Sequence, residues 1–312
     1  MAFGYGVAVA NRANKTVAQT GARSPRAGRA KPGARGHRGA ADTARFPASR
    51  DARRRVLGQN FFRSPQVARS FASQLAELAE PPVAIVEVGA GSGLLTRVLS
   101  ERHSPVLAVE MDPFWARSLE DLDLPGVTVV RDDFVRWAPP PGRLQVIGNI
   151  PFGAGTKILR RCLDLGPQRL QQAVLLMQAE VVRKRVGRWG SNLFNVQWAP
   201  WYELDVGRAF ARHEFRPVPA TNAATLLIEP REPALMPWRE RFGYQNLARD
   251  VFGTGHLTLQ AALRALEPGK PKAWLGRSGL QGSQRVKDLG VQDWVTLYRA
   301  APAAGRDHRG RA

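Results

Sequence analysis

Between residues 83 and 177, short apolar runs alternate with stretches whose apolar residues recur at helical spacing. This alternation constrains the fold more than any other feature of the chain, because it is typical of βαβ units and a mostly parallel sheet. The predicted strands are Val83–Val88, Val106–Val109, Val127–Val130, Leu144–Gly148 and Ala173–Met177. The predicted helices between them are Leu94–Glu101, Pro113–Leu119 and Thr156–Leu163. We therefore expect an α/β fold with a doubly wound sheet.

The pattern changes after residue 200. Two further apolar runs, Tyr202–Phe210 and Ala223–Glu229, flank a turn-rich stretch and predict an antiparallel pair that closes the sheet. Beyond Pro233 the strand pattern fades, and apolar residues at helical spacing predict a small all-helical domain. Its predicted helices are Trp238–Phe252, Leu257–Leu266 and Val286–Tyr298.

The length of 312 residues is enough for about two domains. Residues 1–52 are rich in Gly, Ala, Arg and Pro and have no hydrophobic period, which predicts a disordered segment. We therefore divide the chain into a disordered basic tail (1–52), an α/β domain (53–232), a helical domain (233–298) that helps to hold RNA, and a second basic, disordered tail (299–312).

Basic residues concentrate at the two ends of the chain. Residues 1–55 hold 13 Lys and Arg against two Asp and no Glu, and the formal net charge of the whole chain is +20. Such a balance favours a polyanionic partner, nucleic acid above all. The alternative is a solubilising tail in an arginine-rich proteome, since Arg outnumbers Lys 39 to 7. Likewise Arg183, Lys184, Arg185 and Arg188 either contact RNA phosphates or form a solvated helix face.

Several classes of protein are disfavoured by composition. No stretch approaches the ~20 consecutive apolar residues that a membrane-spanning helix needs, so we expect no membrane span. The single cysteine, Cys162, cannot form an internal disulfide, and the five histidines are scattered. We therefore expect no metal site.

A glycine-rich segment runs from Glu87 to Thr96, directly after a predicted strand and at the start of a predicted helix. Glycines at 89, 91 and 93 permit a tight turn against which a ligand can lie. Their spacing is neither that of the dinucleotide-binding fingerprint nor that of a P-loop. Glu110 and Asp133 end the next two strands, where open α/β sheets bind ligands, and Glu110 is placed to accept ribose hydroxyls. This pattern predicts a nucleoside cofactor, and S-adenosylmethionine is the common one that remains.

The fourth predicted strand ends in Asn149-Ile150-Pro151-Phe152, a form of the (D/N)-P-P-(Y/F) motif of methyltransferases that act on exocyclic amines. With it, the chain resembles the rRNA adenine N6-methyltransferases, which include the Erm resistance enzymes and the small-subunit dimethyladenosine transferases. Leu57–Phe62 and Phe215–Pro219 are similar to the L-G-Q-N-F-L and F-x-P-x-P segments of that family. The resemblance covers about residues 53–232, and Gly89–Gly93 and Asn149–Phe152 are more similar to the Erm branch.

The resemblance implies a Rossmann-like class I methyltransferase fold and S-adenosylmethionine as cofactor. The cofactor-binding residues that it implies are Asn60, Phe62, Gly89, Gly91, Glu110, Asp133 and Asn149. The catalytic residues are Asn149, Ile150, Pro151 and Phe152.

The chemistry of the target fits the last four residues. Adenine N6 is a poor nucleophile, so the demand is for placement more than for a strong base. Asn149 can accept a hydrogen bond from the amine, the Ile150 carbonyl is left unpaired by Pro151, and Phe152 offers a ring to an extruded base. The alternative for Asn149 and Phe152 is a strand-end turn residue and a plain core residue, although Pro151 disfavours a continuous buried strand there.

We therefore expect S-adenosylmethionine-dependent N6-methylation, mono- or di-, of one adenine in 23S rRNA. By resemblance this confers resistance to macrolides, lincosamides and streptogramin B. The alternatives are a 16S rRNA dimethyladenosine transferase and a non-catalytic nucleic-acid-binding relative of the fold. We expect a cytoplasmic enzyme that is monomeric and has no obligate protein partner.

Overall fold

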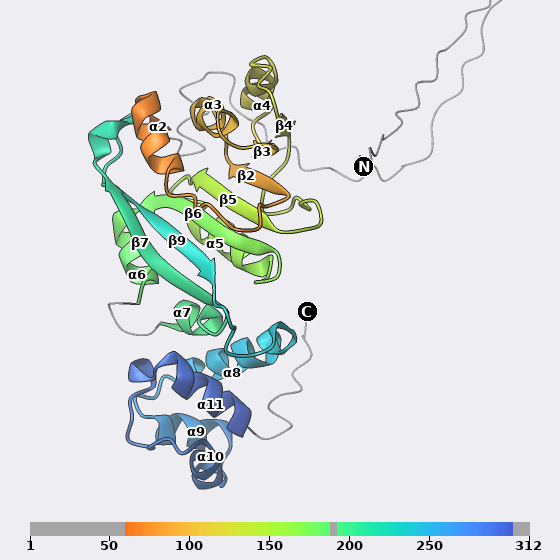
Figure 1. Cartoon of the computed structure of the whole chain (residues 1–312). Helices are drawn as coiled ribbons and strands as arrows, with labels where there is room; N and C mark the ends of the chain where they lie inside the picture. The colour runs from red at the N-terminus through yellow and green to blue at the C-terminus, as the bar shows by residue number, and fades with distance from the viewer. Residues whose placement is uncertain (1–59, 188–191, 302–312) are drawn as a thin grey trace, which may run out of the picture. The chain divides into compact units, whose positions relative to one another are not determined.

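The computed structural model describes residues 60–187 and 192–301, and its ribbon is drawn in Figure 1. The predicted basic tails lie outside the described residues, apart from residues 299–301. Leu57–Gln59 of the first family-like segment and Arg188 of the basic cluster also lie outside them.

A seven-stranded sheet in the order β4-β3-β2-β5-β6-β9-β7 forms the centre of the fold (Figure 1). The first five strands of that order run parallel to one another, and β9 and β7 are antiparallel, as the sequence predicted. A separate two-stranded sheet pairs β1 with β8. The strands are β1 (Phe61–Phe62), β2 (Ala84–Val88), β3 (Val106–Val109), β4 (Val127–Val130), β5 (Leu144–Asn149), β6 (Leu170–Gln178), β7 (Tyr202–Phe210), β8 (Phe215–Arg216) and β9 (Ala223–Pro230).

The central strands are mostly apolar on both sides, because both faces of the sheet are buried. Successive residues of a strand point to opposite faces, and they divide accordingly between two hydrophobic clusters. Val146 belongs to one cluster and Ile147 to the other. In the same way Leu175 belongs to the first cluster, and Val174 on one side of it belongs to the second.

Helices connect the parallel strands and begin close to their carboxyl ends. They are α3 (Leu94–Ser100), α4 (Pro113–Glu120) and α5 (Gly155–Asp164). The start of α4 is set by Pro113 in its first turn and by Asp112, whose side chain accepts a hydrogen bond of 2.9 Å from Phe114 N. Three further helices, α2 (Pro65–Ala72), α6 (Ala179–Arg185) and α7 (Leu193–Trp198), complete this part of the chain.

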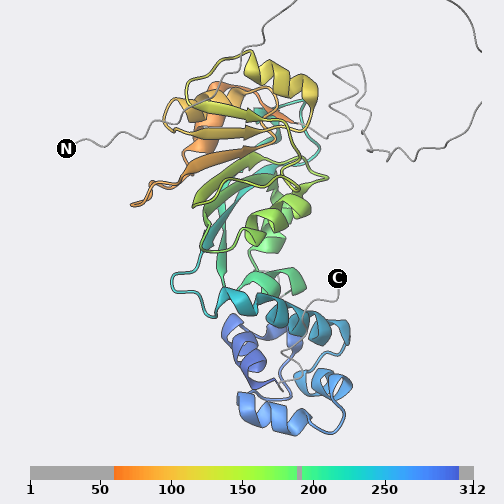
Figure 2. The same ribbon diagram turned by 90° about the vertical axis from the view of Figure 1, so that its right-hand side faces the viewer.

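Only helices follow β9 in the described residues, and in Figure 2 they form one group, coloured blue. They are α8 (Arg241–Gly253), α9 (Leu259–Leu266), α10 (Pro271–Ser278) and α11 (Val291–Ala300). The predicted helices at 238–252 and 286–298 each begin with a short 3₁₀ turn, and α10 was not predicted. None of the helices in the described ranges is both long and apolar enough to cross a bilayer.

Candidate active site

A cavity of about 270 Å³ lies where β2, β3 and β5 end. Six of the residues singled out in the sequence line it: Asn60, Gly89, Glu110, Asp133, Asn149 and Pro151. They come from five separate segments of the chain. Four of these segments meet because parallel strands present their carboxyl ends at one edge of the sheet, and the fifth, at Asn60, precedes β1 of the separate two-stranded sheet. In the sheet, β4, β3, β2 and β5 are consecutive neighbours (Figure 1), so the residues that follow these four strands lie close together.

The glycine loop forms one wall of the cavity. At Gly91, φ is +53°, and an added Cβ would lie 2.6 Å from Cε1 of Phe61. Only glycine therefore combines this backbone conformation with the close approach of the Phe61 ring. Gly89 lines the cavity, and a Cβ placed on it would meet no described atom within 4 Å. The loop thus leaves open space beside its backbone, as a bound ligand would need.

Glu110 is buried at the end of β3 and holds the loop in place. Its Oε2 accepts a hydrogen bond of 2.8 Å from Gly91 N, and its Oε1 accepts one of 2.8 Å from Asp112 N. Burial raises the pKa of Glu110, and the bonds from these two N–H groups oppose the rise. Each carboxylate oxygen keeps a second lone pair with which it can accept a ribose hydroxyl.

Glu87, the first residue of the glycine segment, is also buried, and its Oε2 has no hydrogen-bond partner among the described residues. Burial raises the pKa of this carboxyl to about 8; the Thr96 hydroxyl lowers it and the negative charge of Glu110 raises it further. The side chain is therefore mostly neutral at pH 7. The sequence pattern placed Glu87 in the motif but gave no sign of this protonation state.

The acidic residues after β4 form the next wall. Asp133 Oδ1 accepts a hydrogen bond of 3.0 Å from Val135 N, and Asp132 Oδ1 accepts one of 2.7 Å from Asp133 N. Both residues line the cavity. These turn hydrogen bonds fix the carboxylates beside the open space, where they can accept hydrogen bonds from a ligand amine.

Asn149 is the last residue of β5 and closes the cavity on the side of α5. Its Nδ2 donates a hydrogen bond of 2.5 Å to the main-chain oxygen of Asn60. The Ile150 side chain is buried in the core, and its N–H donates to Leu176 O at 3.0 Å. No described residue donates a hydrogen bond to the Ile150 carbonyl oxygen. Phe152, at the turn that follows Pro151, is half-buried and is not among the residues that line the cavity.

Two of the implied cofactor residues, Phe62 and Gly91, are not among the residues that line the cavity. Phe62 is 7% exposed and packs in the core, with ring centroids 5.4 Å from Phe71 and 5.7 Å from Phe215. Its neighbour Phe61 lines the cavity instead and lies 5.3 Å from the Trp115 ring. Adjacent residues of an extended segment point to opposite sides, so the pattern located the segment but not the side chain.

The cavity also has lining residues that the sequence patterns did not single out. They are Met111, Asp132, Phe134 and Lys157, in addition to Phe61. Met111, Asp132 and Phe134 each adjoin Glu110 or Asp133, so proximity to those acids was the available signal. Lys157 on α5 carried no such signal, because helical periodicity alone does not say which face meets a cavity.

The basic residues after β6 do not all lie on a solvated helix face. Arg185 on α6 is half-buried, and its guanidinium carbon lies 4.1 Å from the centroid of the Phe194 ring. Burial lowers the pKa of Arg185, and the charge of Arg160 adds to this effect. Arg183 and Lys184 of the same helix keep both interpretations open, as neither makes an ion pair in the described part of the chain.

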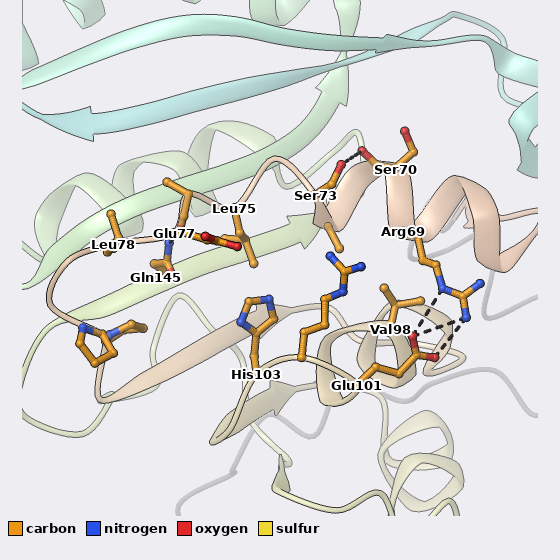
Figure 3. Close-up of a pocket in the computed structure, with 15 residues that line it drawn as sticks. Arg69, Ser70, Ser73, Leu75, Glu77, Leu78, Val98, Glu101, His103 and Gln145 are labelled. Carbon is orange, nitrogen blue, oxygen red and sulfur yellow. Dashed lines mark hydrogen bonds and ion pairs between the residues drawn. The ribbon is translucent and has the colours of Figure 1, made fainter.

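A second cavity, of about 800 Å³, is drawn in Figure 3. It lies beside α2 and the end of α3, where Arg69 and Glu101 form an ion pair of 3.2 Å, and it reaches Gln145 near the start of β5. None of the implied site residues lines it. It lies at the amino end of β5, whereas ligands of open α/β sheets bind at carboxyl ends, so the smaller cavity is the candidate active site.

The residues of the smaller cavity fit a nucleoside cofactor such as S-adenosylmethionine. Glu110 offers acceptors for ribose hydroxyls, and Asp133 offers one for the amine of an adenine ring. Phe61, Met111 and Phe134 supply apolar surface. The open space at Gly89 leaves room beside the glycine loop for the rest of the molecule.

Comparison with known proteins agrees with a nucleoside cofactor and shows similarity to rRNA methyltransferases. The family model described as ribosomal RNA adenine dimethylase matches residues 50–302. The chain is 37% identical to the mycinamicin-resistance protein MyrB of Micromonospora griseorubida, over 83% of this chain and 84% of that protein. It is 31% identical to an rRNA adenine N-6-methyltransferase of Saccharopolyspora erythraea, over 84% of this chain and 70% of that protein.

Solved structures are similar as well. The crystal structure of the 23S rRNA methyltransferase ErmE matches with a TM-score of 0.65 and 30% identity, over 77% of this chain and 99% of that one. A dimethyladenosine transferase from Plasmodium falciparum matches with a TM-score of 0.62 and 17% identity, over 76% of this chain and 95% of that one. The second likeness concerns the fold alone.

Proposed function

Because the chain belongs to the ribosomal RNA adenine dimethylase family, we propose that it methylates N6 of one adenine in 23S rRNA and thereby confers macrolide resistance. Its methyl donor is S-adenosylmethionine, which supplies a methyl group already activated by the sulfonium. The similarity to MyrB and to ErmE supports 23S rRNA over 16S rRNA as the substrate. The observation that carries the proposal is the single cavity that unites Gly89, Glu110, Asp133 and Asn149.

The cofactor end of the cavity performs binding and orientation. Glu110 accepts the ribose hydroxyls, Asp133 accepts a hydrogen bond from the adenine amine of the cofactor, and the Gly89 backbone lies against the remainder. Phe61 replaces Phe62 in the set of cofactor-binding residues. Gly91 acts indirectly, since it allows the Phe61 ring to approach the loop.

The target end holds the amine of an extruded adenine. Asn149 Oδ1 accepts one N6 hydrogen, and the Ile150 carbonyl oxygen accepts the other. With both hydrogens held, the nitrogen lone pair turns towards the methyl group, so the residues act by placement. Pro151 keeps the Ile150 carbonyl out of a ladder bond, and Phe152 stacks on the base, a contact worth ~1–3 kcal/mol.

The test is transfer of radiolabelled methyl groups to a 23S rRNA fragment. We expect Asn149→Ala to lower kcat by about 100-fold or more, the loss typical of one positioned polar group. Phe152→Ala should abolish transfer while it largely spares cofactor binding. Ser100→Ala, in α3 and outside the cavity, is the control that should retain activity. Full activity of Phe152→Ala would contradict the stacking role.

Assays on the same purified protein distinguish the two alternative functions. A 16S rRNA dimethyladenosine transferase would label 16S rRNA in immature small subunits and leave 23S fragments unlabelled. A non-catalytic nucleic-acid-binding relative would bind RNA but show no S-adenosylmethionine binding by isothermal titration. We expect the enzyme to act in the cytoplasm as a monomer, which light scattering during size-exclusion chromatography would check.

A further inference from the structure

The hydrogen bond between Asn149 and Asn60 joins residues that are 89 positions apart in the chain. Asn149 Nδ2 lies 2.5 Å from the main-chain oxygen of Asn60, and that oxygen can only accept. If the Asn149 amide were turned over, its Oδ1 would face another oxygen, and the contact would be repulsive. The Asn60 carbonyl therefore selects one of the two orientations of the amide and leaves Oδ1 as its available end.

The Asn60 carbonyl is itself held in place by the pairing of β1 with β8, which we call the brace (Phe61–Phe62 with Phe215–Arg216). Phe61 is opposite Arg216 and Phe62 is opposite Phe215. One residue further, Arg63 N donates a hydrogen bond of 2.8 Å to Glu214 O. The Phe62 and Phe215 rings are both buried, with centroids 5.7 Å apart. Asn60 thus directly precedes a segment fixed by backbone pairing and by aromatic packing.

We propose that the Asn60 main-chain carbonyl is a positioning group for methyl transfer, and that the brace holds it where it orients the Asn149 amide for the target amine. The inference rests on the proposed function and adds to it a role for two segments that do not themselves hold the target amine. Neither the Asn60 carbonyl nor the brace needs to touch the RNA. Their contribution is to keep the acceptor end of Asn149 available and its donor end occupied.

This arrangement predicts an unusual pH profile for Asn149→Asp. An ionised carboxylate has no proton to donate, so it would be repelled by the Asn60 carbonyl. A protonated carboxyl could donate to that carbonyl and still accept from the target amine with its other oxygen. The ratio of the kcat of Asn149→Asp to that of the unmodified chain should therefore rise as the pH falls, approaching tenfold per pH unit above the pKa of the new carboxyl.

A second measurement does not depend on the activity of that variant. In the unmodified chain, with isotope-labelled asparagine, NMR should show a coupling across the hydrogen bond between Asn149 Nδ2 and the Asn60 carbonyl carbon. Asn149→Ala identifies the resonance. Phe215→Leu, which weakens the brace, should reduce this coupling and lower kcat at least severalfold while the KM for RNA changes little. Leu99→Ala is the control, since Leu99 is fully buried in the same cluster but lies on α3, outside the brace.

The outcomes separate the inference from the proposed function. If the unmodified chain transfers no methyl group to 23S rRNA, the proposed function fails. If it does transfer, the inference is overturned by absence of the coupling, or by Leu99→Ala and Phe215→Leu having equal effects on kcat. It is also overturned if the ratio of the Asn149→Asp activity to that of the unmodified chain stays constant from pH 6 to pH 8. Complete absence of activity of this variant across that range would overturn it as well.

Discussion

Single side chains decide what the cavity can do, and Glu87 shows how burial sets their charge. Its carboxyl is buried, and the Thr96 hydroxyl only partly offsets the cost of burying a negative charge, so its pKa rises to about 8. A carboxyl in the unfolded chain titrates near pH 4.5. Between these values the folded chain holds a proton that the unfolded chain releases. Stability from this residue is thus fully present below pH 4.5 and is lost as the pH rises through 8.

Glu87→Gln removes that dependence. Relative to the variant, the unmodified chain should lose stability by about 1.4 kcal/mol per pH unit, or about 2 kcal/mol from pH 6 to pH 8. Urea unfolding of both proteins without cofactor, at these two pH values, measures the difference. Parallel pH dependence of the two free energies of unfolding would show that Glu87 is ionised in the folded chain.

Substitutions of the neighbours Phe61 and Phe62 should affect different properties, cofactor binding for Phe61 and stability for Phe62. Phe61 lines the cavity, so Phe61→Ala should weaken S-adenosylmethionine binding about tenfold, or ~1.4 kcal/mol. Phe62 packs against Phe71 and Phe215, so Phe62→Ala should lower the free energy of unfolding by ~3–5 kcal/mol. Titration calorimetry and urea unfolding of both variants check this division. The reverse pattern would restore Phe62 to the cofactor site.

At the scale of elements, the sheet could be predicted from the sequence because its strands are buried on both faces. Runs such as Val106–Val109 are apolar at every position, and Leu144–Gly148 is apolar apart from the buried Gln145. The acids and glycines that follow such runs mark the carboxyl ends. The meeting of Gly89, Glu110 and Asp133 at one edge then followed from parallel pairing alone. The cavity-lining side chains outside these strand ends did not follow, as Phe61 on β1 and Lys157 on α5 show.

Helix α10 could not be predicted because its stability comes from contacts outside the helix. Pro268, Gly269 and Pro271 are typical of a loop, and Gly276 lies within the helix. The helix forms because Trp274 is 3% exposed and its Nε1 donates a hydrogen bond of 3.0 Å to Leu297 O on α11. Tertiary packing here overrides local propensity.

Trp274→Ala tests this explanation. Loss of the buried indole and of its hydrogen bond should lower the free energy of unfolding by ~3–5 kcal/mol. Lys272→Ala, at an exposed position of the same helix, should change it by less than ~0.5 kcal/mol. Denaturant unfolding measured by fluorescence compares the two. Equal stabilities would mean that α10 does not depend on its contact with α11.

At the scale of the whole molecule, excess positive charge accompanies a substrate that is a polyanion. The helical region from 233 to 298 has nine Lys and Arg against five Asp and Glu, and the N-terminal 55 residues are more basic still. The domain boundaries and the contribution of these regions to RNA binding stay predictions. Each phosphate contact should contribute to affinity in a way that weakens with salt.

Deletion of residues 1–52 tests the part played by the N-terminal region. If it contacts RNA phosphates, the slope of log affinity against log salt should fall by about 0.7 for each contact removed from a single strand. Filter binding of a 23S rRNA fragment across a salt series measures the slope, with kcat at saturating RNA as the control. An unchanged slope would mean that the region is a bystander in RNA binding.

We propose above all that the protein methylates a 23S rRNA adenine and that the reaction takes place in the cavity at the ends of β2, β3 and β5. The most direct measurement is mass spectrometry of RNase fragments of 23S and 16S rRNA from a macrolide-susceptible host that expresses the chain, with macrolide susceptibility measured in the same cells. We expect N6-methylation at one 23S adenine, unchanged 16S rRNA and raised macrolide resistance, with both the 23S methylation and the resistance absent for Asn149→Ala. Unmodified 23S adenines in cells that contain the folded protein would contradict it.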